Sequence, residues 1–172
     1  MLKEKVEKAL NEQINAELYS AYLYQSMAAY FENKSLAGFA QWMDRQADEE
    51  MIHARKIYDF INERGGRVIL SGIEKPKNEW NSNLEVFEDS LAHEEKITAM
   101  INKLVSLADE EKDYATKSFL KWFVDEQVEE EDSVGEIVDK LKLVGDSTQG
   151  LFMMDDKLAE RKKTNAAEES VE

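Results

Sequence analysis

Six polar residues of ligand type occur in this chain as two sets with the same internal spacing. In each set the second residue follows the first by 33 positions and the third follows the second by three, and the second set begins 77 positions after the first. The sets are Glu17, Glu50 and His53, and Glu94, Gln127 and Glu130. Carboxylates with one imidazole suit iron or manganese better than structural zinc or copper. The repeat therefore predicts a pocket built from two similar halves that could hold two metal ions.

These residues fall on helix faces that should be buried. At about 100° per residue, Glu17 lies within an apolar stripe that contains Leu10 and Tyr24, and Glu50 and His53 share a stripe of their own. An unpaired carboxylate in such a core costs several kcal/mol or becomes protonated. No Lys or Arg lies on the stripes to compensate. The four carboxylates of the two sets carry four negative charges, which two divalent ions would balance.

Taken singly, most of these residues have simpler explanations. One Glu-x-x-His in so acidic a chain is usually accidental, and Tyr24 is most simply a core aromatic with a satisfied hydroxyl. The neighbouring acids Glu49, Glu126 and Glu129 are most simply a solvated face. Two copies at one offset, all on apolar stripes, favour the metal site.

The composition excludes several classes of protein. With 37 acidic against 22 basic residues the net charge is -15, which argues against nucleic-acid binding and suits a protein that attracts cations. The absence of Cys removes disulfides, thiolate metal sites and cysteine nucleophiles, and fits a cytoplasmic protein. No apolar run approaches the length of a membrane span, and the first residues do not resemble a secretion signal.

The low content of helix-breaking residues, seven Gly and one Pro in 172 residues, predicts an almost entirely helical chain. The pattern predicts helices over 4–31 and from a Ser35 cap to residue 63, then a long connection over 65–82. A capping box, Ser82-Asn83-Leu84-Glu85, opens a third helix that ends near residue 110. A turn near Lys112 and Asp113 leads to a fourth helix that stops before Gly145.

The long connection sets the expected topology. It is too long for a tight hairpin and could run back along the bundle, which makes the second and third helices parallel. Ser147 is expected to cap a short fifth helix that ends near Arg161. The prediction is an all-α domain over 1–161: a four-helix bundle with one long crossover between helices 2 and 3 and a short fifth C-terminal helix. Residues 162–172 are expected to form a disordered tail.

The chain resembles the non-haem ferritins of bacteria and archaea over nearly its whole length. The segments that carry the resemblance are Asn-Ala-Glu-Leu-Tyr-Ser-Ala-Tyr-Leu-Tyr around Glu17, Glu-Glu-Met-Ile-His at 49–53, His-Glu at 93–94 and Glu-Gln-Val-Glu-Glu-Glu at 126–131. Ferritin-like bundles use a Glu from two helices and Glu-x-x-His from the other two. Here one Glu-x-x-His is kept and the other is replaced by Gln-x-x-Glu, which resembles ferritins rather than ribonucleotide-reductase-type or rubrerythrin-type sites.

The resemblance implies specific roles at the site. One iron is expected to be held by Glu17, Glu50 and His53, and the other by Glu50, Glu94 and Glu130, with Glu50 bridging the two. Gln127 is expected beside the site as a hydrogen-bonding residue. Tyr24 matches the family's site tyrosine and is expected to donate an electron or to order a carboxylate. A third iron position of such ferritins matches Glu49, Glu126, Glu129 and Glu130.

The implied function is iron storage and detoxification in the cytoplasm. A ferroxidase of this family oxidises two Fe(II) with dioxygen and stores a hydrated Fe(III) oxide inside a homo-oligomeric shell of 24 subunits. Because a fifth carboxylate would hold ferric product more tightly, Gln127 is expected to favour its release.

Three alternatives stay open at this point. A haem-binding bacterioferritin would use a Met, and Met51 sits beside Glu50, although bacterioferritins carry Glu and His where this chain has Gln127 and Glu130. A di-iron enzyme that reduces oxygen or peroxide without storage could use the same bundle, but the rubrerythrin relay needs Cys. The third is a non-catalytic scaffold or a DNA-protecting mini-ferritin, whose family lacks the fifth helix.

Overall fold

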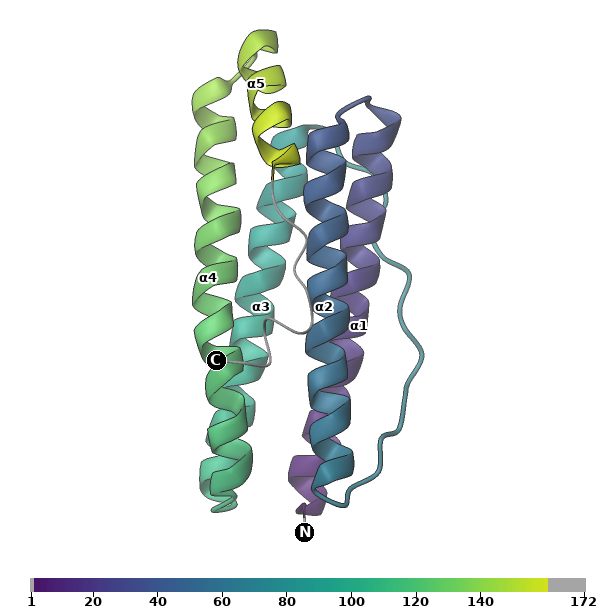
Figure 1. Ribbon diagram of the computed structural model, residues 1–172, viewed down its shortest axis with the longest axis vertical. Coiled ribbons are helices and arrows are strands. Elements are labelled where there is room, and N and C mark those ends of the chain that lie inside the picture. The colour runs from purple at the N-terminus through teal and green to yellow at the C-terminus, as the bar shows by residue number, and fades with distance from the viewer. Residues whose placement is uncertain (1, 161–172) are drawn as a thin grey trace.

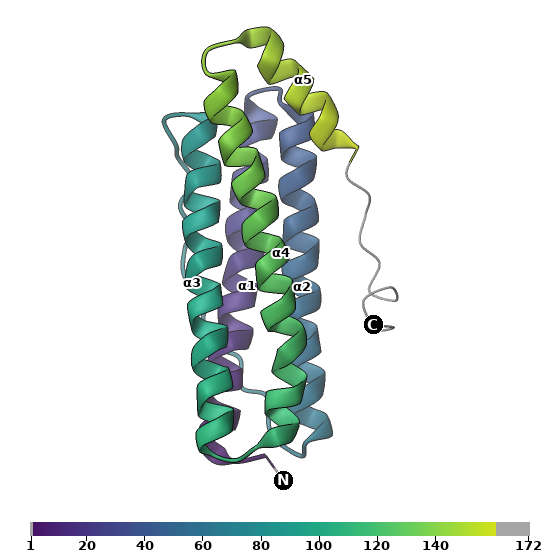
Figure 2. The same ribbon diagram turned by 90° about the vertical axis from the view of Figure 1, so that its left-hand side faces the viewer.

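The computed structural model describes residues 2–160, and these form five α-helices without strands. The helices are α1 (Glu4–Asn33), α2 (Ala37–Glu63), α3 (Asn83–Glu110), α4 (Tyr114–Val144) and α5 (Thr148–Ala159). The first four lie side by side in one bundle, and α5 folds over one end of it (Figure 1 and Figure 2). The predicted all-α bundle is confirmed. The predicted helix end near Arg161 and the predicted tail over 162–172 lie outside the described residues.

The connection between α2 and α3 runs the length of the bundle, so these two helices are parallel, as predicted (Figure 1). Side chains of α1 give this strand-less segment its hydrogen bonds. The Asn11 amide donates to the Arg67 carbonyl (3.0 Å) and accepts from the Ile69 amide (2.7 Å). Farther along, Ser26 donates to the Lys77 carbonyl (2.7 Å). These bonds fix the crossover on α1 because its backbone has no regular partner of its own.

Ser35 was predicted to be the N-cap of the second helix, and this prediction is wrong. Ser35 has φ 58°, which places it in the turn, and Leu36 is the N-cap without a side-chain bond. The Phe39 amide instead donates to the Asp155 carboxylate of α5 (3.0 Å). Gly38 permits this approach, since a Cβ there would lie 1.7 Å from the Asp155 backbone oxygen. The N-terminus of α2 is therefore capped from another helix, which no local pattern reveals.

The other predicted serine caps are confirmed. Ser82 accepts a bond from the Glu85 amide (3.0 Å), and Ser147 accepts one from the Gly150 amide (3.1 Å). Gly145 ends α4 with a positive φ of 52°, but its ψ of -130° lies outside the left-handed helical region that was expected there. A second detail differs, because the Glu85 carboxylate accepts from the Asn81 amide (2.7 Å) rather than from the cap residue. The first helix also continues two residues beyond its predicted end.

The apolar core is divided into two clusters. One contains Phe31, Phe39 and Phe87 and lies toward the α5 end of the bundle. The other contains Ile57 and Ile97 and lies toward the opposite end. Between the two clusters lie the polar residues of the predicted site, so the core is interrupted by a polar layer.

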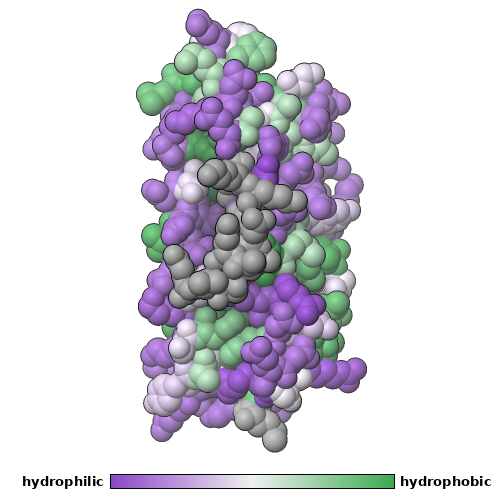
Figure 3. Space-filling view, viewed as in Figure 1, coloured by the Kyte–Doolittle hydropathy of each residue, from purple (hydrophilic) through white to green (hydrophobic). Residues whose placement is uncertain are grey.

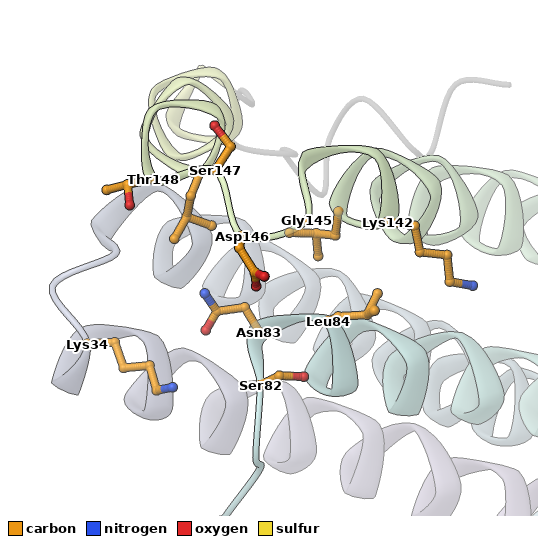
Figure 4. A pocket seen from close by; sticks show the side chains of 11 residues that line it. Lys34, Ser82, Asn83, Leu84, Lys142, Gly145, Asp146, Ser147 and Thr148 are labelled. Carbon is orange, nitrogen blue, oxygen red and sulfur yellow. The ribbon is translucent and has the colours of Figure 1, made fainter.

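A pocket opens where α4 turns into α5 (Figure 4). Its lining includes Lys34, Lys142, Asp146 and the cap residues Ser82 and Ser147. None of the predicted metal ligands lines it, so it is separate from the polar layer.

The surface agrees with the acidic composition. The face in Figure 3 is mostly hydrophilic, with hydrophobic residues in separate patches. No helix in the described part of the chain is long and apolar enough to cross a membrane.

Candidate metal centre

Each helix of the four-helix bundle contributes ligand-type side chains to the polar layer. They are Glu17 of α1, Glu50 and His53 of α2, Glu94 of α3, and Gln127 and Glu130 of α4. Their exposed fractions range from 0% for Glu94 to 6% for Glu130. The prediction that these polar residues occupy core faces is confirmed.

Three of these side chains form the tightest group. Ligand atoms of Glu17, Glu50 and His53 all lie within 4.8 Å of one another, and no other such group of three occurs in residues 2–160. The His53 Nδ1 atom is 3.5 Å from the Glu50 Oε2 atom. Glu50 and His53 come from adjacent turns of α2, whereas Glu17 faces them from α1. One cation could therefore contact both helices.

Among residues 2–160, two oxygens of this group have no hydrogen-bond partner. Glu17 Oε2 and Glu50 Oε2 are buried and accept no hydrogen bond. Buried polar atoms without a partner are rare, and each calls for an explanation such as an ion or water. Among the described residues no Lys or Arg is buried, so the chain supplies no cation to this layer. The donor set and its orphaned oxygens fit divalent metal ions.

The electrostatics of the metal-free layer are unfavourable. Burial and the charge of Glu50 raise the pKa of Glu17 to about 8. Burial and the charge of Glu94 raise the pKa of Glu130 to about 7. Burial, followed by the charges of Glu94 and Glu130, raises the pKa of Glu50 well above its usual value. A bound cation would reverse this by stabilising the carboxylates.

Comparison with known proteins gives a consistent answer. A family model described as a ferritin-like domain matches residues 7–144. This chain belongs to the ferritin family. Bacterial non-heme ferritins of Staphylococcus saprophyticus and Bacteroides fragilis are 46% and 45% identical over 161 residues, which cover 94% of this chain and 96% and 100% of those proteins. The open-pore ferritin of the hyperthermophilic archaeon Archaeoglobus fulgidus is 51% identical, with a TM-score of 0.93 over 94% of this chain and 100% of that one.

Within this ferritin, Tyr24 lies directly on the carboxylate layer. Its hydroxyl donates to Glu94 Oε1 and lies 3.0 Å from the Ser90 hydroxyl, which is therefore the donor of that pair. The ring is fully buried. This hydrogen bond is the contact through which Tyr24 would order Glu94, and that role stays a prediction.

Gln127 lies beside the carboxylates as expected. Its amide donates to Glu94 Oε2 (3.2 Å) and to the Thr98 hydroxyl (3.2 Å). Two further glutamines were not foreseen from the sequence. Gln13 donates to Glu17 Oε1 (2.8 Å), and Gln46 donates to Glu130 Oε2 (2.7 Å). Each lies four positions before a ligand on the same helix, Gln13 before Glu17 and Gln46 before Glu50, and this spacing is the sequence signal that could have located them.

The acids expected at a third iron position are arranged differently from the dinuclear set. Glu49 is buried, Glu126 is partly buried and Glu129 is exposed. Within residues 2–160 these three do not form a group of three close ligand atoms. Their exposure increases from Glu49 through Glu126 to Glu129.

His93, whose role the sequence left open, is buried and contacts α1. Its Nε2 atom is 2.7 Å from the Ser20 hydroxyl, which itself donates to the Ala16 carbonyl (3.1 Å). The ring nitrogen is therefore the donor of the pair. Burial, and next the charge of Lys96, lowers the pKa of His93 to about 4, so the ring is neutral at pH 7.

Proposed function

We propose that this ferritin takes up Fe(II), oxidises it with dioxygen at the carboxylate layer, and stores the hydrated ferric oxide inside an assembly of copies. The observation that carries the proposal is the pair of Glu17 and Glu50 oxygens without a hydrogen-bond donor beside His53, where the described residues include no buried Lys or Arg. The names of the relatives, which are non-heme ferritins, support it.

The layer provides two adjacent positions for the iron substrate. Glu17, Glu50 and His53 would hold one iron, and Glu50, Glu94 and Glu130 the other, with Glu50 between them. Because most of these carboxyls hold protons near neutral pH when no metal is present, uptake of iron releases protons. Tyr24 keeps Glu94 oriented, and its hydroxyl is close enough to the site to pass an electron inward.

Gln127 would favour release of ferric product from the site, so that new Fe(II) can bind. The amide donates to Glu94 without adding a negative charge, so ferric product is held by four carboxylates rather than five. A Gln127→Glu variant is expected to retain ferric iron longer, which is measured as slower regeneration of the site between successive Fe(II) additions. Faster release by the variant would contradict this role.

The series Glu49, Glu126 and Glu129 is the place for a third iron. Exposure increases along this series, so an ion leaving the dinuclear site would meet carboxylates on its way. Replacing Glu126 and Glu129 together by Gln should leave the first two irons bound and slow later turnovers.

Storage requires a closed assembly, and we propose a cytoplasmic shell of 24 copies. Large apolar side chains stay exposed on the single chain, including Leu143 (87%), Phe152 (57%) and Met153 (67%) near the α4–α5 turn, and Ile69 and Leu70 of the crossover. Such exposure is typical of surfaces that become buried between subunits. Sedimentation of the purified protein measures the number of copies directly, and a monomer would contradict the shell.

The first experiment is stepwise addition of Fe(II) in air to metal-free protein, counting the irons that stay soluble per chain. Storage predicts many irons per chain, and a Glu50→Ala, His53→Ala double variant should oxidise Fe(II) more slowly. Glu95→Ala, at an exposed position of α3, is the matched control. If loading stops at about two or three irons per chain, the protein is an oxygen- or peroxide-reducing di-iron enzyme instead.

A further inference from the structure

Three glutamine amides surround the carboxylate layer, and two of them have no assigned role. Gln13 and Gln46 are 1% and 0% exposed, so each amide is removed from water. Each amide donates a short hydrogen bond to a carboxylate that is assigned to one metal position only: Gln13 to Glu17 Oε1 at 2.8 Å and Gln46 to Glu130 Oε2 at 2.7 Å. The two bonds act on carboxylates at opposite sides of the layer.

The bond from Gln13 determines which oxygen Glu17 presents. Gln13 lies one turn before Glu17 on α1, and its amide occupies Oε1. Oε2 is the oxygen left buried without a hydrogen-bond partner, and Glu17 belongs to the close group with Glu50 and His53. Without the amide, rotation of the carboxyl would carry no hydrogen-bond cost.

Gln46 acts across the bundle instead of along one helix. It lies on α2, one turn before Glu50, but its amide bonds to Glu130 of α4. α2 and α4 also meet through ring contacts, since Phe60 stacks on Phe119 (3.9 Å between ring centroids) and His53 packs against Trp122 (5.3 Å). The side-chain bond therefore ties a ligand of the fourth helix to the helix that carries Glu50 and His53.

The same design recurs at Glu94 in an indirect form. Ser90, which is 77 positions after Gln13 and one turn before Glu94, bonds to the Tyr24 hydroxyl, and Tyr24 donates to Glu94. The residue four positions before the ligand thus bonds directly to Glu17 and acts on Glu94 only through Tyr24. The recurrence indicates a function of these positions rather than chance burial.

A neutral amide suits this task better than a charged or an apolar side chain. Lys or Arg would form an ion pair with the carboxylate and compete with the metal for its charge. An apolar side chain would leave a buried carboxylate oxygen without a donor, which is unfavourable. The amide orients the oxygen and leaves the charge of the layer for the metal ions.

We propose that Gln13 and Gln46 are positioning residues that separately set the affinity of the two metal positions, Gln13 through Glu17 and Gln46 through Glu130. The inference rests on the proposed function, because it assumes that the layer binds two metal ions. Hydrogen-bond partners of metal ligands commonly change metal affinity by about ten- to a hundred-fold when they are removed. Each amide should have an effect of this size on its own metal position and a smaller effect on the other.

The test is titration of metal-free protein with Co²⁺, followed by calorimetry and by visible absorption, which reports the coordination of the ion. Gln13→Met and Gln46→Met keep the length of the side chain and remove the donor. Each is expected to weaken one of two binding steps at least about ten-fold, a different step in each variant. Gln25→Met, the same substitution at an exposed position of α1, should change neither step.

The outcomes separate this inference from the proposed function. If the original protein binds no Co²⁺, the proposed function fails. If it binds two ions and both Met variants bind them equally well, the positioning role is wrong. Equal weakening of both steps in both variants also overturns it, since a loosened fold gives that result. Should a Met variant fail to fold, Gln13→Asn and Gln46→Asn keep a buried amide that is too short for the present bond and are expected to weaken the same steps.

Discussion

Replacing Glu17 by Gln is expected to stabilise the metal-free protein, although it removes a proposed iron ligand. Burial and the charge of Glu50 raise the pKa of Glu17 from 4.5 to about 8. Because the folded-state value lies above the unfolded one, the folded chain binds more protons than the unfolded chain between these two pH values. The contribution of Glu17 to stability is therefore complete below pH 4.5 and is lost as the pH rises through 8.

The size of the effect follows from the shift. One pKa unit corresponds to about 1.4 kcal/mol, so Glu17 alone should lower the free energy of unfolding by about 3 to 4 kcal/mol between pH 5 and pH 8. Gln cannot ionise, and its carbonyl can still accept the bond from Gln13. The variant should lose this share of the pH dependence and keep the part that comes from Glu50 and Glu130, whose pKa values are also raised.

Denaturant unfolding of chelator-treated protein, followed by helical circular dichroism from pH 5 to pH 8.5, measures the difference. The Glu17→Gln variant should unfold at higher denaturant than the original protein at pH 8 and at nearly the same denaturant at pH 5. Glu95→Gln, at an exposed site of α3, should follow the original protein throughout. Equal pH slopes for the Glu17 variant and the original protein would refute the claim that burial strains this carboxyl.

Three further positions are tested: a contact between α2 and α5, the cap of α4, and the tyrosine at the carboxylate layer. Gly38→Ala is expected to displace α5 and to lower the free energy of unfolding by about 1–3 kcal/mol, because the added Cβ would lie 1.7 Å from the α5 backbone. Gly135→Ala, with open space around it, should be neutral or stabilising, and thermal unfolding compares the two variants. Asp113→Ala should cost about 1–2 kcal/mol in denaturant unfolding, because it removes both the cap of α4 and the ion pair with Arg64 at 3.1 Å, and Asp113→Asn should recover the cap share. Tyr24→Phe should weaken one Co²⁺ binding step about ten-fold without changing the other, and unchanged binding would remove its ordering role.

Much of the fold could be predicted because its signals are local. Serine caps, Gly145 and the lack of Pro and Gly within the helices depend on neighbours within one or two turns. The length of the crossover was enough to make α2 and α3 parallel. The start of α2 was predicted with the wrong cap because its true partner, Asp155, comes from more than a hundred residues away.

The same distinction between local signals and long-range contacts applies to the site. Glu17 and Glu94 could be located because each interrupts an apolar stripe, and the two stripes repeat at one offset. The bonds from Gln46 to Glu130 and from His93 to Ser20 could not, because helix periodicity gives the direction of a side chain but not the neighbour that it meets. Predicting such pairs requires the relative rotation and height of two helices.

The polar layer also explains why its residues stood out. A core built for stability alone would continue the apolar clusters through the middle of the bundle, and the raised pKa values of Glu17 and Glu130 show that the carboxylates oppose folding when no metal is present. The clusters on either side must supply the stability that the layer lacks. The apolar pattern of a stable core is therefore broken at the carboxylate layer, where the negative charges require cations that the chain does not itself provide. Metal binding and folding stability are linked through the same four carboxylates, so replacing one of them by a neutral side chain should stabilise the metal-free protein and weaken metal binding.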